Sequence, residues 1–228
     1  MFNVNLATPY SLACALVPCA VYLWLHRRTG TLAQRLWAFV FCVYLWQVYE
    51  LTGAGGLSDI FLQLRIFRDL GIHDWASLMA ALSDPNGATV FRSTLNLVPL
   101  MQLSTNFLLN IAMTVPLGFL LPFIWRSWRR PLATILTGAG FSLLIECSQL
   151  LTSRACDIDD FIANTLGAAL GYGCWWFLAQ LACAHQSIGA HLRGASDHPR
   201  EALALIVLSF AGMFFLYHPF WFYNLIGA

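Results

Sequence analysis

Residues 146–171 read ECSQLLTSRACDIDDFIANTLGAALG, and this stretch decides how the chain folds. It predicts an apolar helix that ends near Gln149 and a second apolar helix that begins around Asp157. A link this short makes two helices antiparallel neighbours. Ionisable groups beside long apolar runs are costly, so the charged side chains gathered here are candidates for function.

The spacing of the polar residues gives this stretch a geometry. Asp157, Asp160 and Asn164 stand at i, i+3 and i+7, so they share one face of a helix. Glu146 and Gln149 are three residues apart and share a face of the preceding helix. We therefore expect the two polar faces to meet at one membrane surface, while Asp159 points away from Asp160 toward water.

Small residues in the same stretch predict close helix packing. Gly167 and Gly171 form a G-x-x-x-G pair, with Ala168 beside the first glycine. Small residues at this spacing let the backbone of another helix approach closely. We expect a neighbouring helix to pack on this face.

The composition indicates a polytopic membrane protein. The 228 residues are 59% hydrophobic and only 10% charged, whereas about a quarter of the residues are charged in a typical soluble domain. A net charge of +1 gives no basic surface that would favour nucleic acid. The seven cysteines form neither a disulfide framework nor a Cys/His metal spacing.

The fold class expected is all-α, a bundle of about six transmembrane helices. About 20 apolar residues cross the hydrocarbon core of a bilayer. The runs of this length are residues 6–25, 32–51, 107–125, 132–151, 158–178 and 202–221.

Arginine predicts the orientation of these spans. All 12 basic residues are arginine, and eight of them fall in one set of connections, against four in the opposite set. The set with eight is cytoplasmic by the positive-inside rule. Both termini and the acidic link around Asp157 are then expected to be external.

Four regions follow from this topology. Residues 53–106 are expected to form an external surface segment with amphipathic helices at the interface, near residues 60–70 and 75–82. The full division is 1–52 with two transmembrane helices, 53–106 as the surface segment, 107–181 as a core of three transmembrane helices, and 182–228 with a cytoplasmic loop and the last helix.

Several polar residues are expected at one depth in the outer leaflet. The candidates for ligand binding are Glu146, Arg154, Asp157, Asp160, Asn164, Asn110, Gln149 and Asn106, to which the second span adds Gln47 and Glu50. Glu146 carries most weight, because an unpaired charge inside an apolar span costs several kcal/mol.

Simpler interpretations exist for some of these residues. Asp157 and Asp159 are favoured at a helix N-terminus, where they cap backbone N–H groups and meet the positive end of the helix dipole. Asn106 and Asn110 are also suited to hydrogen bonds between membrane helices.

Three functions suit such an outer pocket. It could bind a lipid headgroup or a lipid-linked cell-envelope molecule without chemistry. It could belong to an enzyme that acts on a lipid-linked phosphate or sugar with Mg²⁺ or Ca²⁺ held at Glu146, Asp157 and Asp160, since carboxylate oxygens suit hard cations. A lipid transporter or scramblase needs a polar path, but the inner halves are apolar apart from Gln34 and Gln180.

The chain resembles the VanZ-like family of bacterial membrane proteins. The resemblance covers roughly Asn96–Tyr172, and its motifs are Asn96-Leu97-Val98-Pro99, Asn110 with Pro116-Leu117-Gly118-Phe119, Glu146-x-x-Gln149, Arg154-x-x-Asp157-Ile158-Asp159-Asp160, and Asn164-Thr165-x-Gly167 with Gly171. Leu100 stands where the family more often has an aromatic residue.

The resemblance implies a location in the bacterial cell membrane. The founding member of the family is associated with low-level resistance to the glycopeptide teicoplanin, so an effect on glycopeptide susceptibility is implied here. The family has no settled biochemical activity, and its motif residues bring no catalytic role to this sequence.

Overall fold

The computed structural model describes residues 7–26, 31–54, 56–69, 71–83, 95–96, 105–149, 156–184, 196, 198 and 200–218. Its long helices are α1 (Ala7–Leu25), α2 (Leu32–Thr52), α5 (Thr105–Ile124), α6 (Pro131–Gln149), α7 (Ile158–Ala184) and α9 (Glu201–Leu216). The shorter elements are α3 (Leu57–Asp69), α4 (Trp75–Ser83), the 3₁₀ helix η1 (Arg126–Arg129), and the two-residue strands β1 (Leu95–Asn96) and β2 (Cys156–Asp157).

The helical fold class is confirmed. Each predicted span coincides with a long helix, and four of the six agree within two residues at both ends. The helix α7 continues beyond the predicted end at residue 178 to Ala184. Among the described residues, α1 from Thr8 onward, α5 and α6 are long and apolar enough to cross a membrane.

The predicted end of the last helix is wrong, because α9 ends at Leu216 and Tyr217 is extended. Pro219 follows His218 in the sequence, and the residue before a proline is disfavoured in a helix.

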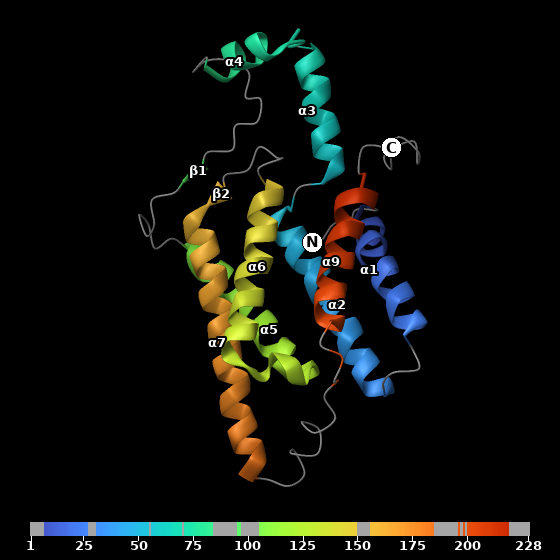
Figure 1. Ribbon diagram of the computed structural model, residues 1–228, viewed down its shortest axis with the longest axis vertical. Helices are drawn as coiled ribbons and strands as arrows, with labels where there is room; N and C mark the ends of the chain where they lie inside the picture. The colour runs from blue at the N-terminus through green and yellow to red at the C-terminus, as the bar shows by residue number, and fades with distance from the viewer. Residues whose placement is uncertain are drawn as a thin grey trace, which may run out of the picture.

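The long helices form two groups of three, which lie side by side in Figure 1. One group consists of α5, α6 and α7, and the other of α1, α2 and α9. In the first group, α5 and α7 are in backbone contact through glycines. A Cβ atom on Gly167 would overlap the Ile111 carbonyl oxygen, and one on Gly171 would overlap the Val115 carbonyl oxygen. The prediction that Gly167 and Gly171 admit another helix is therefore confirmed.

The second group also packs through a glycine, and a buried tyrosine links α2 to α9. A Cβ atom on Gly212 of α9 would overlap the Cys14 carbonyl oxygen of α1. The Tyr49 hydroxyl of α2 lies 3.3 Å from the Ile206 carbonyl oxygen and 3.1 Å from Ser209 Oγ, both on α9. These contacts hold both α1 and α2 against α9, and α1 and α2 also contact each other.

The two groups meet around Trp125, at the end of the bundle that carries η1. The Trp125 side chain is fully buried, and its Nε1 donates a 2.7 Å hydrogen bond to Glu201 of α9. Its ring meets the Phe41 ring of α2 edge-on, with centroids 5.1 Å apart. At this end, the interface therefore combines buried aromatic packing with a hydrogen bond between the two groups.

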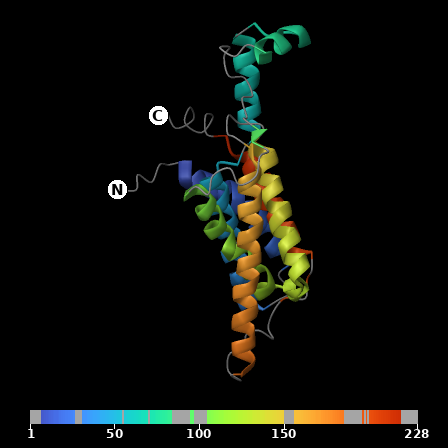
Figure 2. The same cartoon turned by 90° about the vertical axis from the view of Figure 1, so that its left-hand side faces the viewer.

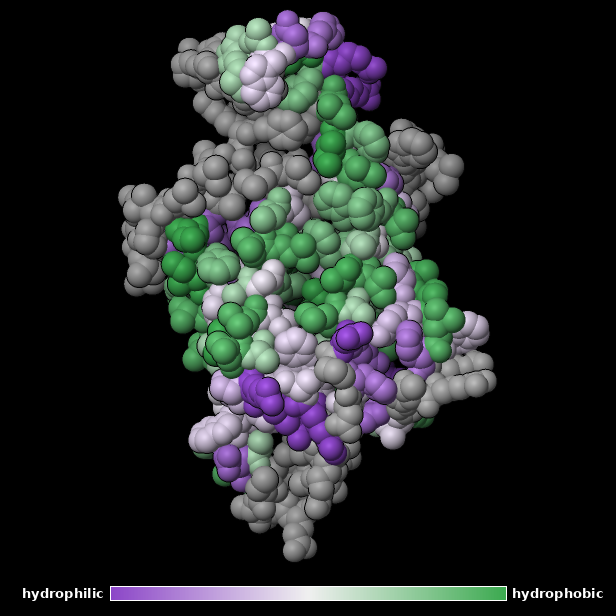
Figure 3. Space-filling model, viewed as in Figure 1, coloured by the Kyte–Doolittle hydropathy of each residue, from purple (hydrophilic) through white to green (hydrophobic). Residues whose placement is uncertain are grey.

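Residues 57–83 leave the opposite end of the bundle. The two short helices predicted there are present, and in Figures 1 and 2 α3 runs outward along the long axis with α4 across its far end. Phe61 and Leu64 of α3 are exposed, as a helix at an interface requires, but an interfacial position stays a prediction. Figure 3 shows hydrophobic side chains over the middle of the bundle and hydrophilic ones toward the η1 end.

The helix α4 begins with a reciprocal cap, which predicts a dependence on pH. The Ser77 backbone N–H donates to Asp74 Oδ1 at 2.7 Å, and the Asp74 backbone N–H donates to Ser77 Oγ at 3.2 Å. Hydrogen bonds from the Ser77 side chain and backbone hold the pKa of Asp74 below its ordinary value of 3.8. The cap is therefore complete above pH 3.8 and weakens as the pH falls through the lowered pKa.

Hydrogen exchange of residues 75–83 measures this effect. We expect the amides of α4 in the wild type to lose protection below the lowered pKa, while Asp74→Asn, which caps a helix without a charge, loses none by this route. Equal pH profiles for the two proteins would show that Asp74 does not hold the helix start.

Candidate functional site

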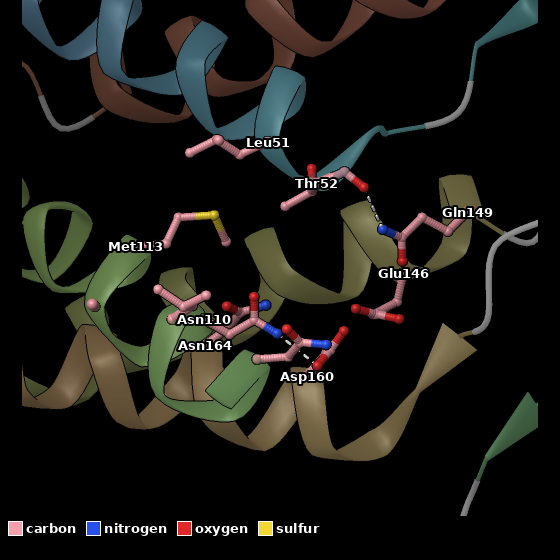
Figure 4. A pocket seen from close by; sticks show the side chains of 11 residues that line it. Leu51, Thr52, Asn110, Met113, Glu146, Gln149, Asp160 and Asn164 are labelled. Carbon is pink, nitrogen blue, oxygen red and sulfur yellow. Dashed lines mark hydrogen bonds between the residues drawn. The ribbon is translucent and has the colours of Figure 1, made fainter. Parts of the chain in front are cut away.

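A cavity of about 540 Å³ lies where the end of α2 meets α5, α6 and α7 (Figure 4). Its described lining residues combine polar and apolar side chains. They are Leu51, Thr52, Asn106, Leu109, Asn110, Ala112, Met113, Glu146, Gln149, Asp160 and Asn164. Six of the eight predicted binding residues are therefore brought together.

Asn164 is the most deeply buried polar side chain of this cavity. It is 2% exposed, and its Nδ2 lies 3.0 Å from Ser142 Oγ of α6. Its Oδ1 is buried and has no hydrogen-bond partner among the described residues. A buried acceptor without a partner costs about 1–3 kcal/mol, so the position favours a donor supplied by something in the cavity.

Polar side chains of α5 and α7 also contact each other at this depth. Asn110 Nδ2 donates to Asp160 Oδ1 at 2.6 Å, and the dashed line in Figure 4 marks this bond. Thr114, one turn further along α5, is buried and donates to the Asn110 carbonyl oxygen at 2.9 Å. The expected hydrogen bond between membrane helices is thus present for Asn110, and Asn106 lies one turn away at the cavity edge.

Glu146 joins the end of α6 to the start of α7. Its side chain is 4% exposed, and its Oε2 accepts the Asp157 backbone N–H at 3.2 Å. This places an acidic side chain at the positive end of the α7 dipole, which is a favourable position for it. Glu146 therefore has both a structural role and a place on the cavity wall.

The three aspartates that open α7 divide into different roles. Asp157 Oδ1 accepts the Asp159 backbone N–H at 2.9 Å, so the capping interpretation of Asp157 is confirmed, and Asp157 is not among the described residues of the cavity wall. The prediction that Asp159 faces water is wrong, because its side chain is only 7% exposed. Asp160 alone of the three lines the cavity.

Gln149 closes the cavity toward the end of α2. Its Nε2 donates to the Thr52 carbonyl oxygen at 2.9 Å, a contact between the two groups of helices. Gln47 and Glu50, which the sequence placed at this depth, are exposed and do not line the described cavity. Arg154 lies outside the described residues.

The described residues do not support a metal centre. They contain no group of three or more His, Cys, Asp and Glu side chains placed to hold a metal ion. Mg²⁺ or Ca²⁺ at Glu146, Asp157 and Asp160 stays a prediction.

Sequence reasoning missed the apolar rim and a strand pairing. Leu51 and Leu109 line the cavity and are 61% and 59% exposed, but nothing in the sequence separates Leu109 from its neighbour Leu108. The strands β1 and β2 pair in parallel, with Asn96 opposite Asp157. Two residues are too short for an alternating pattern, so the sequence does not predict this pairing, although Asn96 and Asp157 both belong to the quoted motifs.

The comparisons with known proteins identify the family. The family model VanZ/LLP1 matches residues 62–179, more than half of the chain. The match begins well before Asn96, where the recognisable motifs start, and it includes α5, α6 and most of α7. No curated protein and no solved structure matches the chain. The chain therefore belongs to the VanZ/LLP1 family.

Proposed function

We propose that this protein binds a lipid or a lipid-linked cell-envelope molecule in the cavity between α2 and the α5–α6–α7 group. The observation that carries the proposal is the pairing of a buried polar wall with an exposed apolar rim. Glu146 and Asn164 lie on the wall, and Leu51 and Leu109 on the rim. A cavity of about 540 Å³ is in the usual range for small-molecule sites, and an amphipathic ligand matches both kinds of surface.

The proposed topology places this cavity in the outer leaflet. We take α2, α7 and α9 as spans together with α1, α5 and α6, which gives six. Arg126, Arg129 and Arg130 lie at or beside η1, the end of the bundle away from the cavity. Because cytoplasmic connections carry the excess of arginine, the cavity, residues 57–83 and both termini are external in this topology.

Native mass spectrometry of the purified protein tests the binding. We expect the wild type to retain a lipid from the bacterial membrane, and Leu109→Trp to retain about tenfold less, because the indole fills the rim of the cavity. The matched control is Leu108→Trp. Leu108 is adjacent, 64% exposed and not among the described lining residues, so its variant should retain lipid like the wild type. Equal retention in all three proteins would contradict binding in this cavity.

The proposed link to glycopeptides is tested separately, by measuring antibiotic susceptibility. We propose that cavity binding raises teicoplanin resistance in bacteria that express the protein. Teicoplanin susceptibility of cells carrying wild type, Leu109→Trp or Leu108→Trp at equal membrane levels tests it. We expect only Leu109→Trp to lose resistance. If the wild type gives no resistance, the proposed link to teicoplanin is wrong.

A further inference from the structure

The hydrogen bonds of the cavity indicate which headgroup it takes. We propose that the ligand is an amphiphile whose headgroup carries several O–H or N–H donors and no net negative charge, and whose apolar chain leaves between α2 and α5. This inference rests on the proposed function, since it names the chemical class of the ligand for the same cavity.

The amide nitrogens of Asn110 and Gln149 on the cavity wall each donate to a protein acceptor. Asn110 Nδ2 donates to the Asp160 carboxylate, and Gln149 Nε2 donates to the Thr52 carbonyl oxygen. Both acceptors require a donor, so the orientation of each amide is fixed. Asn164 Nδ2 lies 3.0 Å from Ser142 Oγ, and in this orientation Asn164 Oδ1 is a buried acceptor without a described partner. The wall therefore presents carboxylate and amide oxygens to a ligand, from Glu146, Asp160 and Asn164.

The charges of the cavity wall also disfavour a negatively charged headgroup. Glu146 and Asp160 both line the cavity, and none of its described lining residues is Arg, Lys or His. A phosphate or carboxylate headgroup would face like charges there, which is costly in a partly desolvated site. Sugar hydroxyls and a primary ammonium group both donate to carboxylate and amide oxygens, so the two kinds of headgroup share the required chemistry.

The described residues define one route by which the acyl chain of the ligand leaves the cavity. The Tyr44 hydroxyl of α2 donates to the Met113 carbonyl oxygen of α5 at 2.9 Å, which ties these helices together about two turns before α2 ends. Beyond this bond, Leu51 and Leu109 are exposed on either side of the cavity. In Figure 4, Leu51 and Met113 lie on the side of the cavity opposite Asp160. An acyl chain that lies across these side chains reaches the bilayer laterally.

The test uses the full chain in phosphatidylcholine nanodiscs that contain equal amounts of three lipids with identical acyl chains. The headgroups are glucose on diacylglycerol, a primary ammonium group, and the phosphate of phosphatidic acid. Native mass spectrometry reports which lipid is retained. We expect at least about a tenfold preference for the glucosyl or the ammonium lipid over phosphatidic acid, and the better of the two identifies the headgroup.

Two variants separate the headgroup contacts from folding. Asn164→Leu removes the buried acceptor and should reduce retention of the preferred lipid about tenfold, while Leu170→Ala, at an exposed site on the same helix, should change nothing. Asp160→Asn keeps an acceptor for Asn110 and removes one charge, so it should reduce the discrimination against phosphatidic acid even if Asn164→Leu does not fold.

The outcomes distinguish the two proposals. A preference for phosphatidic acid, or equal retention of the three lipids that Leu109→Trp abolishes, would overturn the headgroup assignment and leave binding in the cavity intact. Retention that neither Leu109→Trp nor Asn164→Leu alters would overturn both. A preference for a donor headgroup that Asp160→Asn or Asn164→Leu weakens supports both.

Discussion

Gly171→Ala is expected to force α5 and α7 apart and to destabilise the protein by about 3 kcal/mol. The new methyl group would overlap the Val115 carbonyl oxygen and lie 2.9 Å from the Phe119 backbone nitrogen. Both are backbone atoms of α5, so no flexible side chain can give way. Separation of these helices also breaks the geometry in which Asn110 reaches Asp160, so lipid retention should fall together with stability.

Gly173→Ala on the same helix is the matched control. A Cβ atom at Gly173 meets nothing within 4 Å, and alanine is favoured over glycine in a helix by about 0.5–1 kcal/mol. Unfolding by SDS in mixed micelles should therefore show Gly171→Ala less stable than the wild type and Gly173→Ala as stable or more so. If both variants unfold alike, α5 and α7 do not cross in the way described.

Trp125→Ala is expected to cost about 3–5 kcal/mol, the usual range for deleting a fully buried large aromatic side chain. The indole is fully buried, contacts Phe41 and donates to Glu201, so its loss leaves a void and takes away a hydrogen-bond donor from Glu201. Because this contact joins the two groups of helices, the α1–α2–α9 group should lose its position against α5. The rim of the cavity, to which α2 contributes Leu51 and α5 contributes Leu109, would then change shape.

The same unfolding assay measures the effect of Trp125→Ala. Trp176→Ala serves as control, since Trp176 is 52% exposed on α7 and its loss should change the free energy of unfolding by less than about 1 kcal/mol. Trp125→Phe keeps an aromatic ring beside Phe41, loses the hydrogen bond to Glu201 and leaves a smaller void than alanine does, so it should fall between the two. A wild-type stability for Trp125→Ala would show that the groups are held together elsewhere.

The features of this fold that follow from a regular sequence pattern were predictable. Apolar runs of about 20 residues located the long helices, and the four-residue spacing of Gly167 and Gly171 identified the face that admits α5. The spacing of Asn110 and of Asp160 placed both on inward faces, which is why their hydrogen bond follows from the sequence once α5 and α7 are neighbours.

The parts that depend on tertiary contacts were not predictable. Asp159 is buried by residues that pack against the first turn of α7. Helical spacing alone does not predict that packing. Leu109 and Leu108 have the same side chain and nearly the same exposure, yet only Leu109 is among the described residues of the cavity wall. Glu146 was expected to need a partner, but the sequence did not indicate that a backbone N–H of Asp157 would be one.

The most direct test of the central claim is to find where a membrane lipid contacts the protein. A lipid with a photoreactive group close to its headgroup can be incorporated into nanodiscs, activated by light and located by peptide mass spectrometry. The proposal predicts labels concentrated on residues 105–113 and 51–52, lost in Leu109→Trp and kept in Leu108→Trp. Labels spread over the exposed faces of α1 and α9, and equal in the two variants, would contradict a lipid-binding cavity at this site.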